Sequence, residues 1–140
     1  RVSGHARDQG QTIEWSLILK VLCPPPDRGQ PTDHDYWRRE VDAYESGFLS
    51  DLPGGLVAPQ CFSVIEHPNG ECWIWMEDIK DEVGPTWPLE HYGTVARHLG
   101  RFSGAYLTGR PLPSHPWLSR GWMRHEVVRE APAVAKLQLY

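Results

Sequence analysis

The chain has few cysteines, and their arrangement excludes the covalent frameworks that cysteine supports. Cys23, Cys61 and Cys72 are an odd number and lie far apart in the sequence. They do not form a CxxC pair, the spacing that is typical of redox motifs and zinc sites. Their spacing also does not suggest the disulfide scaffold of a secreted protein. We therefore expect free thiols and a reducing, cytoplasmic setting.

Long apolar runs and clusters of positive charge are also missing. No segment approaches the ~20 apolar residues of a membrane span, and the N-terminus has neither a methionine nor the apolar core of a signal peptide. With 14 basic and 18 acidic residues the formal charge is −4, and no basic block offers the clustered Lys and Arg that neutralise phosphates. These absences predict no membrane partner and no nucleic-acid partner. They also lead us to expect that the chain begins inside a longer reading frame.

Several motifs for nucleotide binding, hydrolysis and metal binding are absent. The sequence has no GxGxxG and no GxxxxGK[ST], which argues against Rossmann and P-loop sites, and no GxSxG turn of the kind that hydrolases use. No two His or Cys residues stand at a ligand spacing such as CxxC or HxxxH. We expect no metal site within the chain.

The first half of the sequence alternates strand and helix patterns. Residues 13–22 are apolar on both faces of an extended strand, which is typical of a central strand. A buried helical stripe then runs from Trp37 to Phe48, with Thr32 or Asp33 as its N-cap. Strand patterns at 61–65 and 72–76 flank the turn signal at 67–70, which predicts a hairpin.

The second half contains helix patterns only. A long helix is expected from Pro88, which suits a first helical position, to Gly109, which can close it in the left-handed conformation. Within it, Gly100 and Gly104 lower helix propensity and predict close packing against another element. A third helix is expected at 122–139. The fold class is therefore α+β, with a sheet-containing lobe at 1–79 and a connecting segment with the start of a helical lobe at 80–140.

Three positions carry candidate chemistry. Lys20 stands near the end of an apolar strand, where it is either a solvated edge lysine or a cation held beside phosphates by an acid. Glu40 and Glu45 flank the buried stripe of the following helix at similar angles, so helical geometry alone does not choose between them. The strand that ends at Met76-Glu77-Asp78-Ile79 exposes backbone groups that an adenine edge can use.

The order of these elements resembles the aminoglycoside phosphotransferase family, which has the protein-kinase-like fold. The resemblance covers about residues 12–107 and is carried by Leu17-Ile-Leu-Lys20, Tyr36-Trp-Arg-Arg-Glu40-Val-Asp-Ala-Tyr44, Ala58-Pro-Gln-Cys-Phe-Ser-Val64, Trp73-Ile-Trp-Met-Glu-Asp-Ile79 and Leu99-Gly-Arg-Phe-Ser-Gly-Ala-Tyr-Leu107. It implies a kinase-like N-lobe, a small and mostly antiparallel sheet with one helix, followed by the first helices of a helical C-lobe.

The resemblance also implies site residues and cofactors. Lys20 would contact the α- and β-phosphates of ATP, and the Arg-Glu context selects Glu40 as its partner. Met76 would line the adenine pocket, while the Glu77 carbonyl and the Ile79 amide would make the adenine hydrogen bonds. The activity implied is Mg²⁺-dependent transfer of the γ-phosphate of ATP to a hydroxyl of a small molecule. An aminoglycoside-, choline- or sugar-like acceptor stays open.

The sequence departs from the family pattern at two places. Only Val2–Gly4 is left of the strands and nucleotide-covering loop expected before the lysine strand. No histidine begins the family's His-x-Asp-x-x-x-x-Asn catalytic loop. We expect the base and the magnesium ligands beyond Tyr140, and we predict that this piece alone transfers no phosphate. We also expect an exposed apolar face on the 89–106 helix, which favours self-association.

Seven tryptophans support a different hypothesis. Trp73 and Trp75 share one face of their strand, where they could stack sugars or peptides. Trp15 and Trp37 fall on stripes that look like core. The alternative to the enzyme is therefore a non-catalytic nucleotide- or ligand-binding module, either pseudokinase-like or a Trp-rich binding domain.

Overall fold

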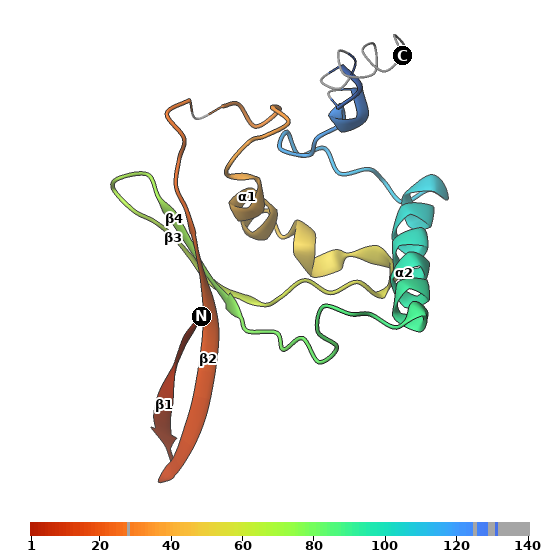
Figure 1. The fold of residues 1–140 in the computed structure, drawn as a ribbon. Coiled ribbons are helices and arrows are strands. Elements are labelled where there is room, and N and C mark those ends of the chain that lie inside the picture. The colour runs from red at the N-terminus through yellow and green to blue at the C-terminus, as the bar shows by residue number, and fades with distance from the viewer. Residues whose placement is uncertain (28, 125, 129–130, 132–140) are drawn as a thin grey trace, which may run out of the picture.

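A computed structural model describes residues 1–27, 29–124, 126–128 and 131. The chain folds in the order shown in Figure 1. The elements are β1 (Val2–Asp8), β2 (Gln11–Leu22), α1 (Arg39–Glu45), the 3₁₀ turns η1 (Phe48–Asp51) and η2 (Pro53–Gly55), β3 (Cys61–Glu66), β4 (Cys72–Glu77) and α2 (Leu89–Leu107).

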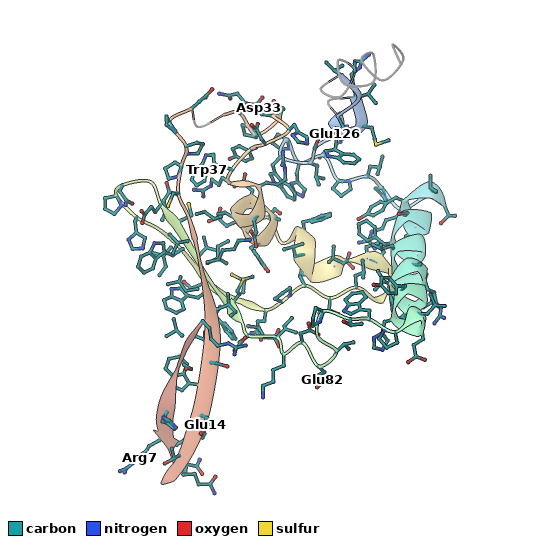
Figure 2. The ribbon with its side chains drawn as sticks, viewed as in Figure 1. Arg7, Glu14, Asp33, Trp37, Glu82 and Glu126 are labelled. Carbon is teal, nitrogen blue, oxygen red and sulfur yellow. The ribbon has the colours of Figure 1, made fainter. Side chains whose placement is uncertain are left out.

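The four strands form one antiparallel sheet in the order β1-β2-β4-β3. This arrangement confirms the α+β class, the central position of the lysine strand and the hairpin of β3 and β4. Val2–Gly4 is more than a remnant, because β1 runs on to Asp8 and pairs along its whole length with β2. Since β4 pairs only with residues 17–22 of β2, the far end of the β1–β2 hairpin extends beyond β3 and β4 as a two-stranded ribbon. The positions of Arg7 and Glu14 in Figure 2 show this extension.

The core lies between the sheet and α1. Val41 of α1 and Cys72, Ile74 and Met76 of β4 form its buried centre. Trp37 and Tyr44 pack against this cluster. The predicted apolar stripe is therefore confirmed at Val41 and Tyr44, whereas Trp37 and Phe48 lie outside the helix.

The opposite face of the sheet carries apolar side chains that no described residue buries. Trp15 is 40% exposed there, so its expected place in the core is wrong. Its ring lies over Gly4, where a Cβ atom would come within 2.9 Å of a ring carbon. The absence of a side chain at Gly4 thus allows Trp15 to lie flat across two strands.

The helix α1 is shorter than the pattern predicts. The pattern indicates a start at Thr32 or Asp33, but the helix begins at Arg39 and ends at Glu45. The carbonyls of Asp33 and His34 accept hydrogen bonds from the guanidinium of Arg39 instead of from helical amides. Beyond the helix, Gly47 takes a left-handed conformation with φ of +73° and separates it from η1.

The helix α2 matches its prediction, and only its packing differs. It spans Leu89–Leu107 with Pro88 at the N-cap, and Gly109 follows it with a positive φ of +116°. The expectation of close packing at Gly100 and Gly104 is wrong, because a Cβ atom there would meet nothing within 4 Å. Leu89, at 85% exposed, is typical of the apolar face that we expected to be open.

The third predicted helix is only partly covered by the described residues. Residues 122–124 and 126–128 are helical, and most of the remaining predicted range lies outside the described part of the chain. Among the helices that are described, none combines the length and apolar character needed to cross a membrane.

Candidate functional site

Lys20 and Glu40 meet on the α1 side of the sheet. Lys20 lies opposite Ile74 of β4 in the ladder, and Glu40 lies in the first turn of α1. The Lys20 ammonium and the Glu40 carboxylate form an ion pair. Their side chains are 46% and 35% exposed. The pair is therefore formed and still reachable by a ligand.

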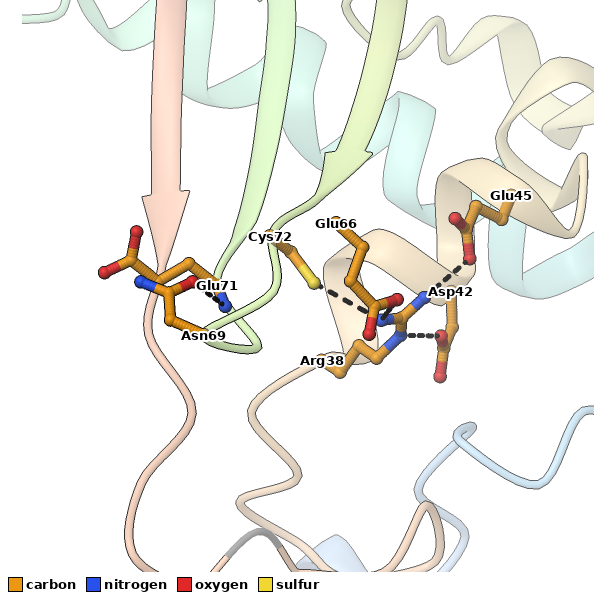
Figure 3. Close-up of polar contacts among 7 residues, drawn as sticks. All are labelled: Arg38, Asp42, Glu45, Glu66, Asn69, Glu71 and Cys72. Carbon is orange, nitrogen blue, oxygen red and sulfur yellow. Dashed lines mark hydrogen bonds and ion pairs between the residues drawn. The ribbon is translucent and has the colours of Figure 1, made fainter.

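Glu45, the other candidate partner of Lys20, belongs to a different cluster centred on Arg38 (Figure 3). The Arg38 guanidinium bonds Glu66 at 2.8 Å, Glu45 at 3.1 Å and Asp42 at 3.2 Å. These contacts join the N-terminal end of α1 to the β3–β4 hairpin, and they leave Glu40 as the acid available to Lys20.

Arg38 stays charged in this cluster. Burial by itself lowers the pKa of Arg38, but the hydrogen bonds that Arg38 donates to the carboxylates of Glu66, Asp42 and Glu45 outweigh it and raise that pKa above its ordinary value. Because the positive charge is permanent, Arg38 is a fixed cross-link between α1 and the hairpin.

Cys72 lies at the edge of the same cluster. Its sulfur is 3.3 Å from Nη1 of Arg38, and the residue is fully buried. Burial raises the pKa of the Cys72 thiol, and the nearby Arg38 opposes that shift only in part. A buried thiol with a raised pKa is a poor nucleophile, so Cys72 is a packing residue of the core.

Of the other predicted site residues, Met76 lies nearest to the ion pair along the ladder. It pairs with Ile18, two positions before Lys20 on the same face of β2, and only 8% of it is exposed. Most of the Met76 side chain is thus packed in the core, so any contact with a ligand would use its exposed edge.

Glu77 and Ile79 mark the point where β4 leaves the sheet. The Glu77 amide donates to the Gln60 carbonyl at 2.9 Å, and its carboxylate accepts from the Gln60 amide at 3.1 Å. Ile79 is 59% exposed in the segment that follows. The Glu77 amide is therefore occupied, and the predicted adenine contacts depend on the Glu77 carbonyl and the Ile79 amide.

A polar cavity at the β1–β2 hairpin was not predicted from the sequence. It has a volume of about 450 Å³ and is lined by Ser3, Gly4, His5, Glu14, Trp15, Ser16 and Lys80. Glu14 and Ser16 lie on the same face of β2 as Lys20, since they are separated from it by even numbers of residues. Glu14 and Ser16, which line part of the cavity, thus lie on the face of the sheet that carries the ion pair, whereas Trp15 belongs to the opposite face. No local sequence pattern indicates the cavity, because residues 3–5 reach it only through the pairing of β1 with β2.

The carboxylate of Asp78 borders this region. A hydrogen bond from Ser16 and, to a smaller extent, the guanidinium of Arg1 lower the pKa of Asp78 below its ordinary value, and the opposing effect of desolvation is weaker than the Ser16 bond. Arg1 approaches Asp78 at 2.8 Å. Asp78 is therefore held as an anion between the start of β1 and the middle of β2.

In the part of the chain that the structure describes, no three or more His, Cys, Asp or Glu side chains are grouped so as to hold a metal ion. Comparisons with family models, with curated proteins and with solved structures find no match for this chain.

Proposed function

We propose that this chain is the nucleotide-binding portion of an ATP-dependent phosphotransferase that transfers the γ-phosphate to a hydroxyl of a small molecule. The observation that supports this most is the ion pair between Lys20 on β2 and Glu40 on α1. A lysine held by an acid from a neighbouring helix is the arrangement that phosphoryl-transfer sites use to orient an ammonium toward ATP. A four-stranded antiparallel sheet with one helix inserted before β3 is compatible with the small lobe of such an enzyme.

The proposed nucleotide lies along the face of the sheet that carries the ion pair. Lys20 neutralises phosphate charge there, and Glu40 keeps its side chain from turning into solvent. The adenine lies against Met76 and bonds the Glu77 carbonyl and the Ile79 amide, where β4 has left the sheet. When Mg²⁺ is bound with ATP, it neutralises the charge that develops on the phosphates.

Catalysis itself is not assigned to residues of this chain. We propose neither a base nor magnesium ligands among the described residues. The chain is therefore proposed to bind ATP without transferring phosphate, and the acceptor class is left as an aminoglycoside-, choline- or sugar-like alcohol.

Binding of ATP to the 140-residue chain tests the proposal. Isothermal titration with Mg-ATP is expected to show binding that Lys20→Ala and Glu40→Gln each weaken. Arg97→Ala is the matched control, because Arg97 is an exposed cation on α2. Equal affinity in the wild type and in folded Lys20→Ala would show that Lys20 does not contact the nucleotide.

The second candidate is the binding module without nucleotide chemistry. It is favoured by the exposed apolar face of the sheet, where Ile13 (46%), Val21 (44%) and Ile65 (41%) accompany Trp15. Such a module would bind its ligand through Trp15 and its neighbours on that face. Its affinity would fall with Trp15→Ala and would be unaffected by Lys20→Ala, which separates it from the phosphotransferase.

A further inference from the structure

The segment that follows α2 turns back and packs against the region of α1 (Figure 1). Within it, Trp117 is only 6% exposed. The Trp117 ring meets Phe48 of η1 edge-on at 5.6 Å between centroids and stacks on His115 at 4.9 Å, and His115 also meets Phe48 edge-on at 6.2 Å. An aromatic cluster thus holds residues 110–118, which we call the strap, against the C-terminal side of α1.

Two arginines, one inside the strap and one in α1, hold the strap in place by donating hydrogen bonds to backbone carbonyls and to one carboxylate. Arg110, at the start of the strap, donates to the Asp51 carbonyl at 2.6 Å and to the Asp51 carboxylate at 2.7 Å. Arg39, the first residue of α1, donates through Nε to the Trp117 carbonyl at 2.7 Å. The strap is therefore fixed at both of its ends.

Arg39 also holds the chain that leads into α1. Its Nη1 donates to the His34 carbonyl at 2.8 Å and its Nη2 to the Asp33 carbonyl at 2.6 Å. One guanidinium thus joins two segments that are about 80 residues apart to the first turn of α1. The acceptors of these three hydrogen bonds are carbonyl oxygens, so Arg39 acts here through the directions of its donors.

The position of α1 depends on such contacts. It has seven residues and no side-chain cap at its N-terminus, whereas an isolated helix needs roughly 12–15 residues to be even marginally stable. Its N-cap and first two residues reach three different partners: Arg38 bonds the β3–β4 hairpin, Arg39 bonds the strap, and Glu40 pairs with Lys20. Loss of one anchor would let the first turn shift, and Glu40 would move with it.

We propose that the strap positions Glu40 against Lys20, with Arg39 and Trp117 as positioning residues, so that the state of the strap regulates the proposed nucleotide site. The nucleotide part of this inference rests on the proposed function. A partner or ligand that displaces the strap would weaken the Lys20–Glu40 pair, and by linkage ATP bound at Lys20 would stabilise the docked strap.

Lysine NMR tests the positioning without any nucleotide. The chain has three lysines, Lys20, Lys80 and Lys136, so ¹³C-lysine labelling of the full chain gives one ε-CH₂ signal each. Glu40→Gln defines the Lys20 shift of the broken pair. We expect Arg39→Ala and Trp117→Ala to move the Lys20 signal toward that position and to leave the Lys80 signal in place.

Matched controls separate this effect from general loss of structure. Arg97→Ala and Trp87→Ala remove an arginine and a partly exposed tryptophan away from the strap, and they should leave the Lys20 signal unmoved. If Trp117→Ala unfolds the chain, all lysine signals change together. Arg39→Lys then carries the test, because it keeps the charge but has one nitrogen in place of the Nε, Nη1 and Nη2 atoms that bond the three carbonyls. A Lys20 signal that stays at its wild-type position in folded Arg39→Ala and Arg39→Lys would overturn the proposal.

An ATP titration tests the regulatory part. We expect Arg39→Ala to weaken Mg-ATP binding by about tenfold, within the usual range of coupling between sites, and Glu40→Gln to add little in the Arg39→Ala background. Fully additive losses would overturn the coupling. If the wild type binds no ATP, the proposed function fails, while the lysine signals still decide whether the strap positions Glu40.

Discussion

Replacement of Gly54 by alanine should destabilise the fold more than replacement of any freely exposed glycine. Gly54 lies in η2 with φ of +81° and packs directly on the backbone of α2. A Cβ atom there would lie 2.7 Å from the Phe102 amide nitrogen, 3.0 Å from the His98 carbonyl oxygen and 3.1 Å from the Arg101 carbonyl carbon. These are backbone atoms of a helix, so no side-chain rotation relieves the clash.

The expected loss has two parts. The left-handed conformation costs an alanine ~1–2 kcal/mol, and an overpacked contact that must push elements apart costs a further ~1–3 kcal/mol. Part of the second cost is the 2.7 Å hydrogen bond between His98 Nδ1 and the Gly54 carbonyl, which is lost if η2 moves away. The free energy of unfolding should therefore fall by roughly 2–5 kcal/mol, a large fraction of the ~5–15 kcal/mol typical of a domain.

Gly84→Ala provides the control. Gly84 has a similar φ of +72°, but nothing lies within 4 Å of its Cβ position, so only the conformational cost of ~1–2 kcal/mol applies. Urea unfolding followed by tryptophan fluorescence measures both variants. If the two free energies of unfolding agreed within ~0.5 kcal/mol, the close approach of η2 to α2 would be refuted.

Three further predictions concern other parts of the molecule. Arg38→Ala should lower the free energy of unfolding by ~1–3 kcal/mol, because it leaves the carboxylates of Asp42, Glu45 and Glu66 without their shared donor; an unchanged urea midpoint would contradict this. Cys72 is buried and has a raised pKa, so it should react with iodoacetamide only after unfolding, while exposed Cys23 should react in the native state. Mass spectrometry of the labelled peptides measures which cysteine reacts first, and labelling of Cys72 in the native state would contradict the prediction. Ser16→Ala should raise the pKa of Asp78 toward its ordinary value, since the Ser16 bond is the main cause of its lowering. The stability that Asp78 contributes through its lowered pKa is present above the unfolded-state pKa of ~3.9 and disappears as the pH falls through the folded-state pKa. The Ser16→Ala variant should therefore be less stable than wild type at pH 7, and the difference should be smaller at strongly acidic pH. An equal difference at both pH values would count against the bond.

Much of the sheet could be predicted because its signals are local. The turn at 67–70 between two apolar strands predicts the β3–β4 hairpin, and apolar residues on both faces of 13–22 predict a central strand. The limits of α2 follow from Pro88 and Gly109 for the same reason. In each case the residues that decide the structure lie within the element or next to it.

The features that could not be predicted depend on residues far apart in the sequence. The late start of α1 follows from Arg39, which binds the carbonyls of Asp33 and His34 and also reaches Trp117. No helical periodicity contains that information. The extension of β1 to Asp8 likewise follows from its pairing with β2.

The choice between Glu40 and Glu45 illustrates the same limit at the candidate site. Both lie beside the buried stripe of the helix, so helical geometry leaves them equal. The family resemblance selects Glu40, and the structure pairs Glu40 with Lys20 and Glu45 with Arg38. The close packing of glycine was predicted for Gly100 and Gly104 and occurs instead at Gly54, in the turn η2 that faces the helix. A glycine in the sequence indicates that two backbones can approach each other closely, but it does not indicate whether the glycine at the contact comes from the helix or from the element packed against it.

The affinity of the 140-residue chain for Mg-ATP tests the central claim most directly. Titration calorimetry of the wild type, Lys20→Ala and Arg97→Ala compares the proposed phosphate ligand with an exposed cation elsewhere. We predict binding in the wild type and in Arg97→Ala, and at least about tenfold weaker binding in folded Lys20→Ala, equivalent to the loss of one directed charge contact. Absence of binding in the wild type, or equal affinity in all three proteins, would contradict it.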